Sequence, residues 1–298
     1  MKKLIKPPKF VKNFVYRRRI KKHKKLTPEQ LPDAMAKWYS ARTGEVIDWN
    51  NLQGFSQKIQ WIKIHDITDL KTQCADKYRV REYVENVVGK QYLIPLIGVW
   101  EKPEDIDFDA LPQSFVLKMN NSSGENIIVR DKSTFDPKKA IKKLRKWMRS
   151  EFAYLALEFH YAKIKPLIIA EQYMENNKND LMDYKFMCFD GLVKDCRIDV
   201  DRWSNHKRLV FDAEGNVIPA KYGTPDSVGL ENYQLPENFK EMVEVSSKLS
   251  KGFKVVRVDL YNVDGKIYFG EMTFTPASGV EKITPREYAL ELGDLIKI

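Results

Sequence analysis

A turn signal near the C-terminus constrains the fold of this chain more than any other feature. Two alternating stretches, residues 256–261 and 270–276, are separated by a segment that contains Asp264-Gly265. An Asp-Gly pair between alternating apolar runs is a strong indication of an antiparallel hairpin. A loop of three residues that ends at Lys266 would bring the two stretches into register as neighbouring strands.

One face of this hairpin collects polar side chains. In that register Asp259 lies opposite Glu271 and Arg257 lies opposite Thr273, and strand periodicity puts all four on one face. Two carboxylates directly opposite each other repel, so positive charge is expected between them. Two interpretations stay open: a Mg²⁺ ion that binds nucleotide phosphates, or Arg257 alone neutralising the pair in a structural network.

The composition is that of a soluble globular protein with one large or two modest domains. The chain has 298 residues, of which 43% are hydrophobic. The longest stretch without charge, residues 91–100, is too short to span a bilayer, and no signal-peptide pattern is visible. Three cysteines without CxxC spacing predict reduced thiols in a cytoplasmic protein. Four scattered histidines argue against a zinc site.

The net charge of +10 originates in the first 25 residues, which contain twelve Lys and Arg and no acid. Removing these twelve from the 51 basic residues leaves 39 against 41 acidic ones, a net of −2. Apolar residues lie between the cations, so residues 1–26 are predicted to form a basic amphipathic tail on an anionic membrane surface. A nucleic-acid arm and a solvated disordered tail are the alternatives. The near-neutral remainder offers no basic platform, so no nucleic-acid partner is expected.

The predicted fold class is α+β with mainly antiparallel sheets, because strands and helices mix without a regular βαβ alternation. The expected helices are 27–44, 55–63, 71–88, 136–149 with a continuation through 160, 237–250, and one that begins near 285. The expected strands are 93–100, 114–118, 126–129, 167–170, 184–189, 192–199 and the C-terminal hairpin, with a loop-rich region before 233.

A small polar loop lies between two of the expected strands. Its residues Ser122, Ser123 and Gly124 can expose backbone N–H groups and hydroxyls to phosphate oxygens, and Lys118 precedes the loop. The loop matches neither the GxxxxGK[ST] nor the GxGxxG phosphate motif. Taken alone, an ordinary hairpin loop is the simpler interpretation.

Two further strands carry residues suited to a nucleotide. The strand that begins at Ile168 ends in Glu171, followed by Tyr173 and Met174, which could pair with and stack on an adenine. A strand that simply leaves the core explains them equally well. Lys185 lies between two aromatic residues, where it either points into a site or is the outward residue of an alternating strand.

In this order the features form the ATP-grasp pattern, and the chain resembles the TupA-like ATP-grasp family, which is named for teichuronopeptide biosynthesis and found in surface-polysaccharide gene clusters. The matching segments are 55–63, 75–84, 92–96, 115–118, 183–186 and 257–279. The resemblance implies two α+β subdomains whose antiparallel sheets clamp ATP, in a domain over residues 111–298. A helical region over residues 27–110 would precede it.

The resemblance also implies ATP and Mg²⁺ as cofactors and assigns a role to each matching position. Lys77, Lys118 and Lys185 would hold the phosphates under a loop of Ser122, Ser123 and Gly124; Glu171, Tyr173 and Met174 would line the adenine site; Asp259, Glu271 and Thr273 would hold the metal; Arg257 and Lys185 would be catalytic; and Arg197, Arg202 and Ser278 would face the substrate. Thr273 stands where many ATP-grasp ligases carry Asn, so its role as a metal ligand stays open.

The function implied is an ATP-dependent carboxylate–amine ligase that acts through an acyl phosphate. It would join an amino acid to a uronic acid or acidic polymer during surface-polysaccharide synthesis, at the inner face of the membrane. The alternative is a glycosyltransferase that binds a nucleotide-sugar through Asp199-Val200-Asp201. This DxD tripeptide is common and lies in an alternating run, which a solvated strand explains. The two substrates, the oligomeric state and catalytic competence are not determined by the sequence.

Overall fold

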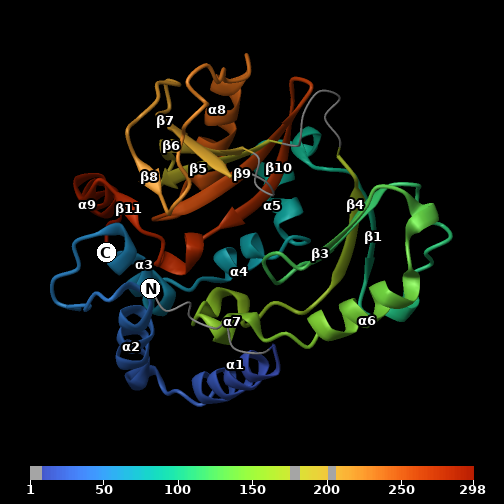
Figure 1. Cartoon of the computed structure of the whole chain (residues 1–298), viewed down its shortest axis with the longest axis horizontal. Coiled ribbons are helices and arrows are strands. Elements are labelled where there is room, and N and C mark those ends of the chain that lie inside the picture. Colours follow the sequence, from blue (N-terminus) through green and yellow to red (C-terminus); the bar gives the residue numbers. More distant parts are fainter. Residues whose placement is uncertain (1–8, 175–181, 201–205) are drawn as a thin grey trace.

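The computed structural model describes residues 9–174, 182–200 and 206–298, and side chains from residue 15 onward. The described chain has the expected α+β architecture, with antiparallel pairing throughout its sheets (Figure 1). The helices are α1 Lys9–His23, α2 Leu31–Thr43, α3 Phe55–His65, α4 Asp69–Ala75, α5 Val80–Val87, α6 Pro137–Trp147, α7 Phe152–Leu155, α8 Phe239–Ser250 and α9 Arg286–Leu295. The strands are β1 Leu96–Trp100, β2 Phe115–Met119, β3 Asn126–Val129, β4 Ile168–Gln172, β5 Asp183–Phe189, β6 Leu192–Val200, β7 Lys207–Phe211, β8 Lys221–Tyr222, β9 Val256–Val263, β10 Lys266–Thr273 and β11 Ile283–Thr284.

The larger sheet has five strands in the order β10-β9-β5-β6-β7. Its residues alternate between two faces, so Tyr184, Phe186 and their neighbours fill an apolar core beneath α8 and α5. Lys185, on the opposite face, pairs with Asp259 of β9 on one side and with Arg197 of β6 on the other. The sheet therefore presents a row of charged residues on the face away from α8.

The smaller sheet has four strands in the order β1-β4-β2-β3, and α6 covers one face (Figure 1). Phe115, Leu117 and Met119 alternate inward along β2 and pack with Leu144 of α6. Lys118 lies on the other face of β2, beside β4. A two-stranded sheet of β8 and β11 completes the strand pairing among the described residues.

The N-terminal helices pack against the rest of the chain rather than forming a separate unit. Phe55 and Ile59 of α3 contact Leu292 and Ile296 from the C-terminal segment in a second core. His23, at the end of α1, contacts the carbonyl oxygen of Tyr154 in α7 through its Nδ1 at 2.6 Å. No described helix has the length and apolar character needed to cross a membrane.

The helix expected over 71–88 is interrupted, which is a correction to the sequence prediction. The chain forms α4 and α5 with a turn between them, because the Oδ1 of Asp76 accepts the backbone N–H groups of Tyr78 (2.8 Å) and Arg79 (3.2 Å). Such side-chain acceptors cap the start of a helix. The break leaves Lys77 at the turn, where its own backbone N–H donates to the carbonyl of Asn120.

Three other expectations about elements differ from the structure. The continuation of the 136–149 helix through residue 160 is only α7 and a short 3-10 turn. The strand expected to begin at Leu93 begins at Leu96. The region expected to be loop-rich contains β7, which pairs with β6. The sequence did not indicate β7 because it begins with the polar pair Lys207-Arg208 and only its end is apolar. Pairing with β6 makes it a strand.

Candidate active site

The C-terminal hairpin has the expected pairing at its polar end but not at its turn. The loop contains two residues, Asp264 and Gly265, so the lower ladder is shifted by one residue from the prediction. A bulge at Gly270 compensates for this shift. Above it Asp259 pairs with Glu271, as expected. A Cβ at Gly270 would lie 3.0 Å from the backbone oxygen of Asp259, which explains the glycine.

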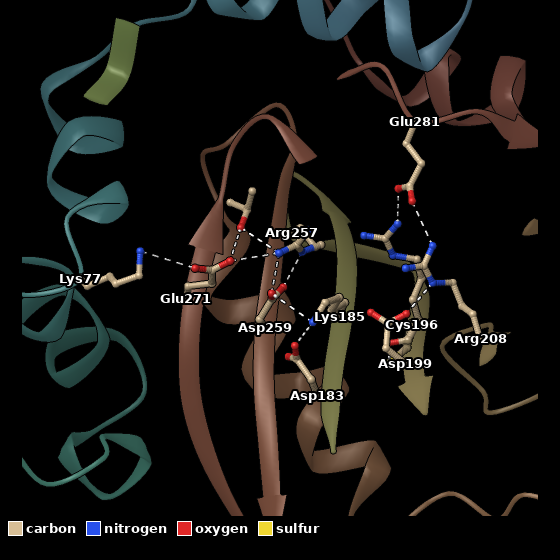
Figure 2. Close-up of polar contacts among 12 residues, drawn as sticks. Lys77, Asp183, Lys185, Cys196, Asp199, Arg208, Arg257, Asp259, Glu271 and Glu281 are labelled. Carbon is tan, nitrogen blue, oxygen red and sulfur yellow. Dashed lines mark hydrogen bonds and ion pairs between the residues drawn. The ribbon is translucent and has the colours of Figure 1, made fainter. Parts of the chain in front are cut away.

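Arg257 is the centre of the polar cluster (Figure 2). Its Nε and Nη2 donate to the two carboxylate oxygens of Asp259, both at 2.6 Å. The same Nη2 lies 3.1 Å from Glu271 Oε1 and 3.1 Å from Thr273 Oγ1, and Thr273 Oγ1 donates to Glu271 Oε1 at 3.0 Å. The positive charge expected between the carboxylates is therefore supplied by Arg257.

The donor set also fits a hard divalent cation in type and number. Mg²⁺ in nucleotide sites binds one or two carboxylates and takes its remaining ligands from phosphates and water. Asp259 and Glu271 provide two carboxylates, and Thr273 adds a hydroxyl. Among the described residues no group of three or more His, Cys, Asp or Glu side chains gathers, so the nucleotide would have to complete the coordination.

The carboxylate of Glu271 is ionised far below neutral pH. Burial raises its pKa, but Lys77, Arg257 and the Thr273 hydroxyl outweigh this and lower it to about 2. The negative charge of Glu271 balances two cations from different parts of the chain, Lys77 and Arg257. Burial favours the neutral form of Arg257, yet Asp259 and Glu271 raise the pKa of its guanidinium.

Lys77 reaches this cluster from the turn between α4 and α5. Its Nζ lies 3.7 Å from Glu271 Oε2 and donates to the backbone oxygen of Ser122 at 2.5 Å. Lys77 therefore connects the hairpin with the loop for which the family resemblance implies phosphate binding. Ser122 is buried, whereas Ser123 and Gly124 are exposed at the tip of this loop. Gly124 has a φ of +73°, a conformation that glycine adopts most easily.

On the four-stranded sheet, Lys118 and Glu171 face each other. Lys118 Nζ donates to Glu171 Oε2 at 2.6 Å, and Arg81 Nη1 donates to Glu171 Oε1 at 3.3 Å. Glu171, predicted for the adenine site, thus has its side chain engaged with two cations. Tyr173 and Met174 follow β4 and are half-buried.

Lys185 lies beside the hairpin, on the sheet face that carries its charged residues. Its Nζ is 3.6 Å from Asp259 Oδ2 and forms an ion pair with Asp183 of the same strand. Figure 2 shows Lys77, Glu271, Arg257, Asp259, Lys185 and Asp183 as one chain of contacts across adjacent strands.

Three residues are predicted to face the substrate, and the two that the structure describes, Arg197 and Ser278, have different neighbours. Arg197 is buried and donates to Glu281 Oε2 at 2.8 Å. Arg202 lies outside the described residues. Ser278 belongs to the turn Pro276–Gly279 that follows the hairpin, where its φ is +55°.

That turn is held by α3. The Nζ of Lys63 donates to the backbone oxygen of Ser278 at 2.8 Å, and Gln60 donates to the backbone oxygens of Ser278 (3.2 Å) and Gly279 (3.0 Å). Burial lowers the pKa of Lys63 to about 7, although Glu158 acts in the opposite direction. The N-terminal region therefore contacts the polypeptide immediately beyond the predicted metal ligands.

In the DxD alternative, the first aspartate, Asp199, is already engaged by basic side chains. Asp199 Oδ1 accepts hydrogen bonds from Arg208 Nε (2.6 Å) and contacts His206 Nε2 (2.9 Å). Burial acts against ionisation of Asp199, but these partners lower its pKa far below the usual range. Asp201 lies outside the described residues.

Sequence reasoning assigned no role to several members of these networks, among them Gln60, Lys63, Arg81, Asp183, Arg208 and Glu281. Asp183 and Lys185 are two residues apart, a spacing that places both on one face of a strand. Arg81, Arg208 and Glu281 come from elements distant in sequence from their partners, so no local pattern indicated them.

The TupA-like ATP-grasp family model matches residues 57–297. This chain belongs to that family. Its fold is accordingly ATP-grasp, with the two sheets described above.

Solved structures of ATP-grasp ligases are similar to this chain. D-alanine–D-alanine ligase from Bacillus anthracis, in complex with ATP, is 20% identical over 75% of this chain and 63% of its own, with a TM-score of 0.41. The Helicobacter pylori D-alanine–D-alanine ligase is 12% identical over 85% of this chain and 74% of its own, with a TM-score of 0.44. D-cycloserine synthetase DcsG is 14% identical over 84% of both chains, with a TM-score of 0.43.

The chain spans less than two thirds of the Bacillus anthracis ligase. A search of curated protein sequences returned no match.

Proposed function

We propose that this TupA-like ATP-grasp protein is an ATP-dependent, ADP-forming ligase that joins a carboxylate to an amine. The observation that carries the proposal is the continuous row of charges on one sheet face, from Glu271 through Arg257 and Asp259 to Lys185. Lys77 approaches this row from the turn before α5 and also contacts Ser122 of the 122–124 loop. Alternating acids and bases in one plane suit a triphosphate and a divalent cation.

In the proposed reaction an oxygen of the substrate carboxylate attacks the γ-phosphorus of ATP, and ADP leaves. The resulting acyl phosphate is attacked at its carbonyl carbon by the amine, which loses a proton as the amide forms and inorganic phosphate leaves. Lys77, Lys118 and Lys185 would hold the phosphates, with the 122–124 loop over them and adenine near Glu171, Tyr173 and Met174. Mg²⁺ bound to Asp259 and Glu271, with Thr273 as a further oxygen donor, would neutralise phosphate charge.

Arg257 would act on the transferred group. Its guanidinium is held rigidly by Asp259, and preorganised donors of this kind stabilise the charge that develops in a transition state without further reorganisation. Lys185, on the adjacent strand, would contribute to the same charge. This chemistry requires no covalent enzyme nucleophile, which agrees with buried thiols at Cys74, Cys188 and Cys196.

The family supports a narrower proposal for the substrates. The acid would be a uronic acid or acidic polymer and the amine an amino acid, in surface-polysaccharide synthesis at the inner face of the membrane. Ser278 and Arg197 would face these substrates, together with Arg202. A screen of uronic acids and amino acids with Mg²⁺-ATP, with ADP release as the readout, would identify the pair.

Thermal unfolding with nucleotides tests the proposal. A ligand at 100 times its Kd stabilises the folded state by about 2.7 kcal/mol, so Mg²⁺ with ATP or ADP should raise the Tm of the parent protein. Glu271→Gln should abolish the Mg²⁺-dependent part of this shift, because it removes one of two carboxylates. Glu271 is the better target than Asp259, whose replacement would also disrupt two hydrogen bonds of Arg257.

The control is Glu287→Gln, an exposed carboxylate in the first turn of α9, which should keep the full shift. Protection by a UDP-sugar with Mn²⁺ and indifference to ATP would contradict the ligase proposal. Asp199 and Asp201 would then become the candidate site of a glycosyltransferase.

A further inference from the structure

Two guanidinium groups from adjacent strands converge on a single carboxylate beside the proposed active site. Arg197 Nη1 of β6 donates to Glu281 Oε2 at 2.8 Å, and Arg208 Nη1 of β7 donates to Glu281 Oε1 at 3.0 Å. Figure 2 shows Glu281 above the sheet, with Arg208 beneath it. A guanidinium suits a carboxylate because its fork of N–H donors matches the two carboxylate oxygens.

The two arginines differ in how they are neutralised. Arg208 has a second carboxylate of its own, since its Nε donates to Asp199 at 2.6 Å. Within the described part of the chain, Glu281 is the sole carboxylate that forms a salt bridge with Arg197. Arg197 is 3% exposed, its guanidinium lies 4.4 Å from the centre of the Tyr222 ring, and its buried Nε has no hydrogen-bond partner among the described atoms.

Glu281 does not belong to the sheet that carries the arginines. It follows the Pro276–Gly279 turn and precedes β11, so it lies on a connecting segment. Its side chain is 22% exposed, against 3% for Arg197 and 10% for Arg208. The carboxylate is thus the most exposed member of the trio, and a dissolved carboxylate could replace it without uncovering the arginines.

The strand register relates this trio to the reacting centre. Arg197 pairs with Lys185, and Lys185 pairs with Asp259. Neighbouring strands are about 4.8 Å apart, so the backbone of Arg197 lies roughly 10 Å across the sheet from the backbone of Asp259. Arg197 and Asp259 are thus separated by one strand, β5, on the same sheet face, and a substrate that spans both positions would place one carboxylate at each.

We propose that Arg197 and Arg208 form a subsite for a second substrate carboxylate, one that does not react, and that Glu281 occupies this subsite in the free protein. The inference rests on the proposed ligase function and narrows its substrate to one that carries an additional carboxylate. The exchange involves no covalent step, and the charge on the two arginines stays balanced because one carboxylate replaces another. A neighbouring uronate and the carboxylate of an amino acid are the two sources of this chemistry.

Calorimetric binding in the presence of Mg²⁺-ADP tests the subsite. The probes are digalacturonate for a uronate source, glutamate for an amino-acid source, and galactose as an uncharged comparison. Glu281→Gln removes the internal competitor but keeps its size, so one acidic probe should bind at least about fivefold more tightly, the lower end of ordinary coupling between linked sites. Galactose should show no such gain. Arg197→Gln should lose the binding of that probe.

The outcomes separate this inference from the ligase proposal. Unchanged or absent binding of both acids to folded Glu281→Gln overturns the subsite, whatever the nucleotide does. If Mg²⁺ with ATP or ADP does not raise the Tm of the parent protein, the ligase proposal is overturned instead. If Glu281→Gln does not fold, Glu281→Asp keeps the charge on a side chain shorter by one methylene, and it should bind the acid more tightly than the parent. Equal affinity in that variant contradicts the proposal.

Discussion

Most buried titratable residues described above have a partner of opposite charge. The buried His160 has no such partner in the described part of the chain. It is 3% exposed, its ring centre lies 4.2 Å from that of Tyr161, and its Nε2 has no partner among the described atoms. Burial lowers its pKa to about 3, and the nearby Lys71 and Lys63 act in the same direction. The folded protein therefore keeps this ring neutral.

This burial predicts a loss of stability in acid. Between pH 6.5 and about 3 the unfolded chain binds a proton at His160 that the folded chain does not. The contribution of His160 to the free energy of unfolding is therefore fully present above pH 6.5 and declines as the pH falls. The slope is about 1.4 kcal/mol per pH unit at most. His160→Phe should reduce the acid dependence of the unfolding free energy, measured by denaturant titration at several pH values. The control, His65→Asn at an exposed site, should leave this acid dependence unchanged. If the unfolding free energy of His160→Phe varied with pH as steeply as that of the parent, this interpretation would be wrong.

Among the elements, the β9–β10 hairpin depends most on a local irregularity. Its turn has two residues rather than three, and the bulge at Gly270 restores the register in which Asp259 faces Glu271. Because a shift of one residue moves every side chain to the other face, the carboxylates meet only if the bulge is present. The position of the site thus depends on one glycine.

Gly270→Ala should therefore weaken both stability and nucleotide binding. Its Cβ would lie 3.0 Å from the Asp259 backbone oxygen and 3.1 Å from the Tyr261 ring. Overpacking of this kind costs about 1–3 kcal/mol, and relief by movement of β9 would displace Asp259. Gly54→Ala, where no atom lies within 4 Å and φ is negative, serves as the control. Parental affinity for Mg²⁺-ADP in Gly270→Ala would exclude a role for the bulge.

At the scale of the whole molecule, charge is distributed unevenly. The first 25 residues carry twelve cations, and the described part of this segment is helical from Lys9. The end of α1 contacts α7 through His23 and through the ion pair of Lys24 with Glu151. Removal of residues 1–25 would break these contacts, so neutralising exposed cations is the cleaner way to test the predicted membrane tail.

Replacing Arg17, Lys21 and Lys22 by glutamine should reduce co-sedimentation with anionic vesicles at low salt. Each cation near such a surface contributes about 1 kcal/mol, so three should change the binding constant by roughly 100-fold. The control replaces Lys240, Lys248 and Lys266, exposed residues around α8 at the opposite end of the molecule (Figure 1). Equal losses in both variants, or tight binding of RNA instead of vesicles, would contradict the membrane prediction.

The sequence by itself determined the features that arise from local periodicity. Alternation placed Arg257, Asp259 and Glu271 on one face, and the strands expected over 184–189 and 192–199 pair with each other as β5 and β6. The fold class and the family also followed from the order of the segments. These properties depend on neighbours in the chain, which a sequence contains directly.

Tertiary structure decided what joins distant segments. The bulge at Gly270, the break of the predicted 71–88 helix and the pairing of β7 each depend on a partner elsewhere in the chain or on competition between local bonds. Glu281 shows this most clearly, because nothing near it in sequence indicates that it bridges Arg197 and Arg208. A buried charge requires a compensating charge, and only the folded chain determines which residue provides it.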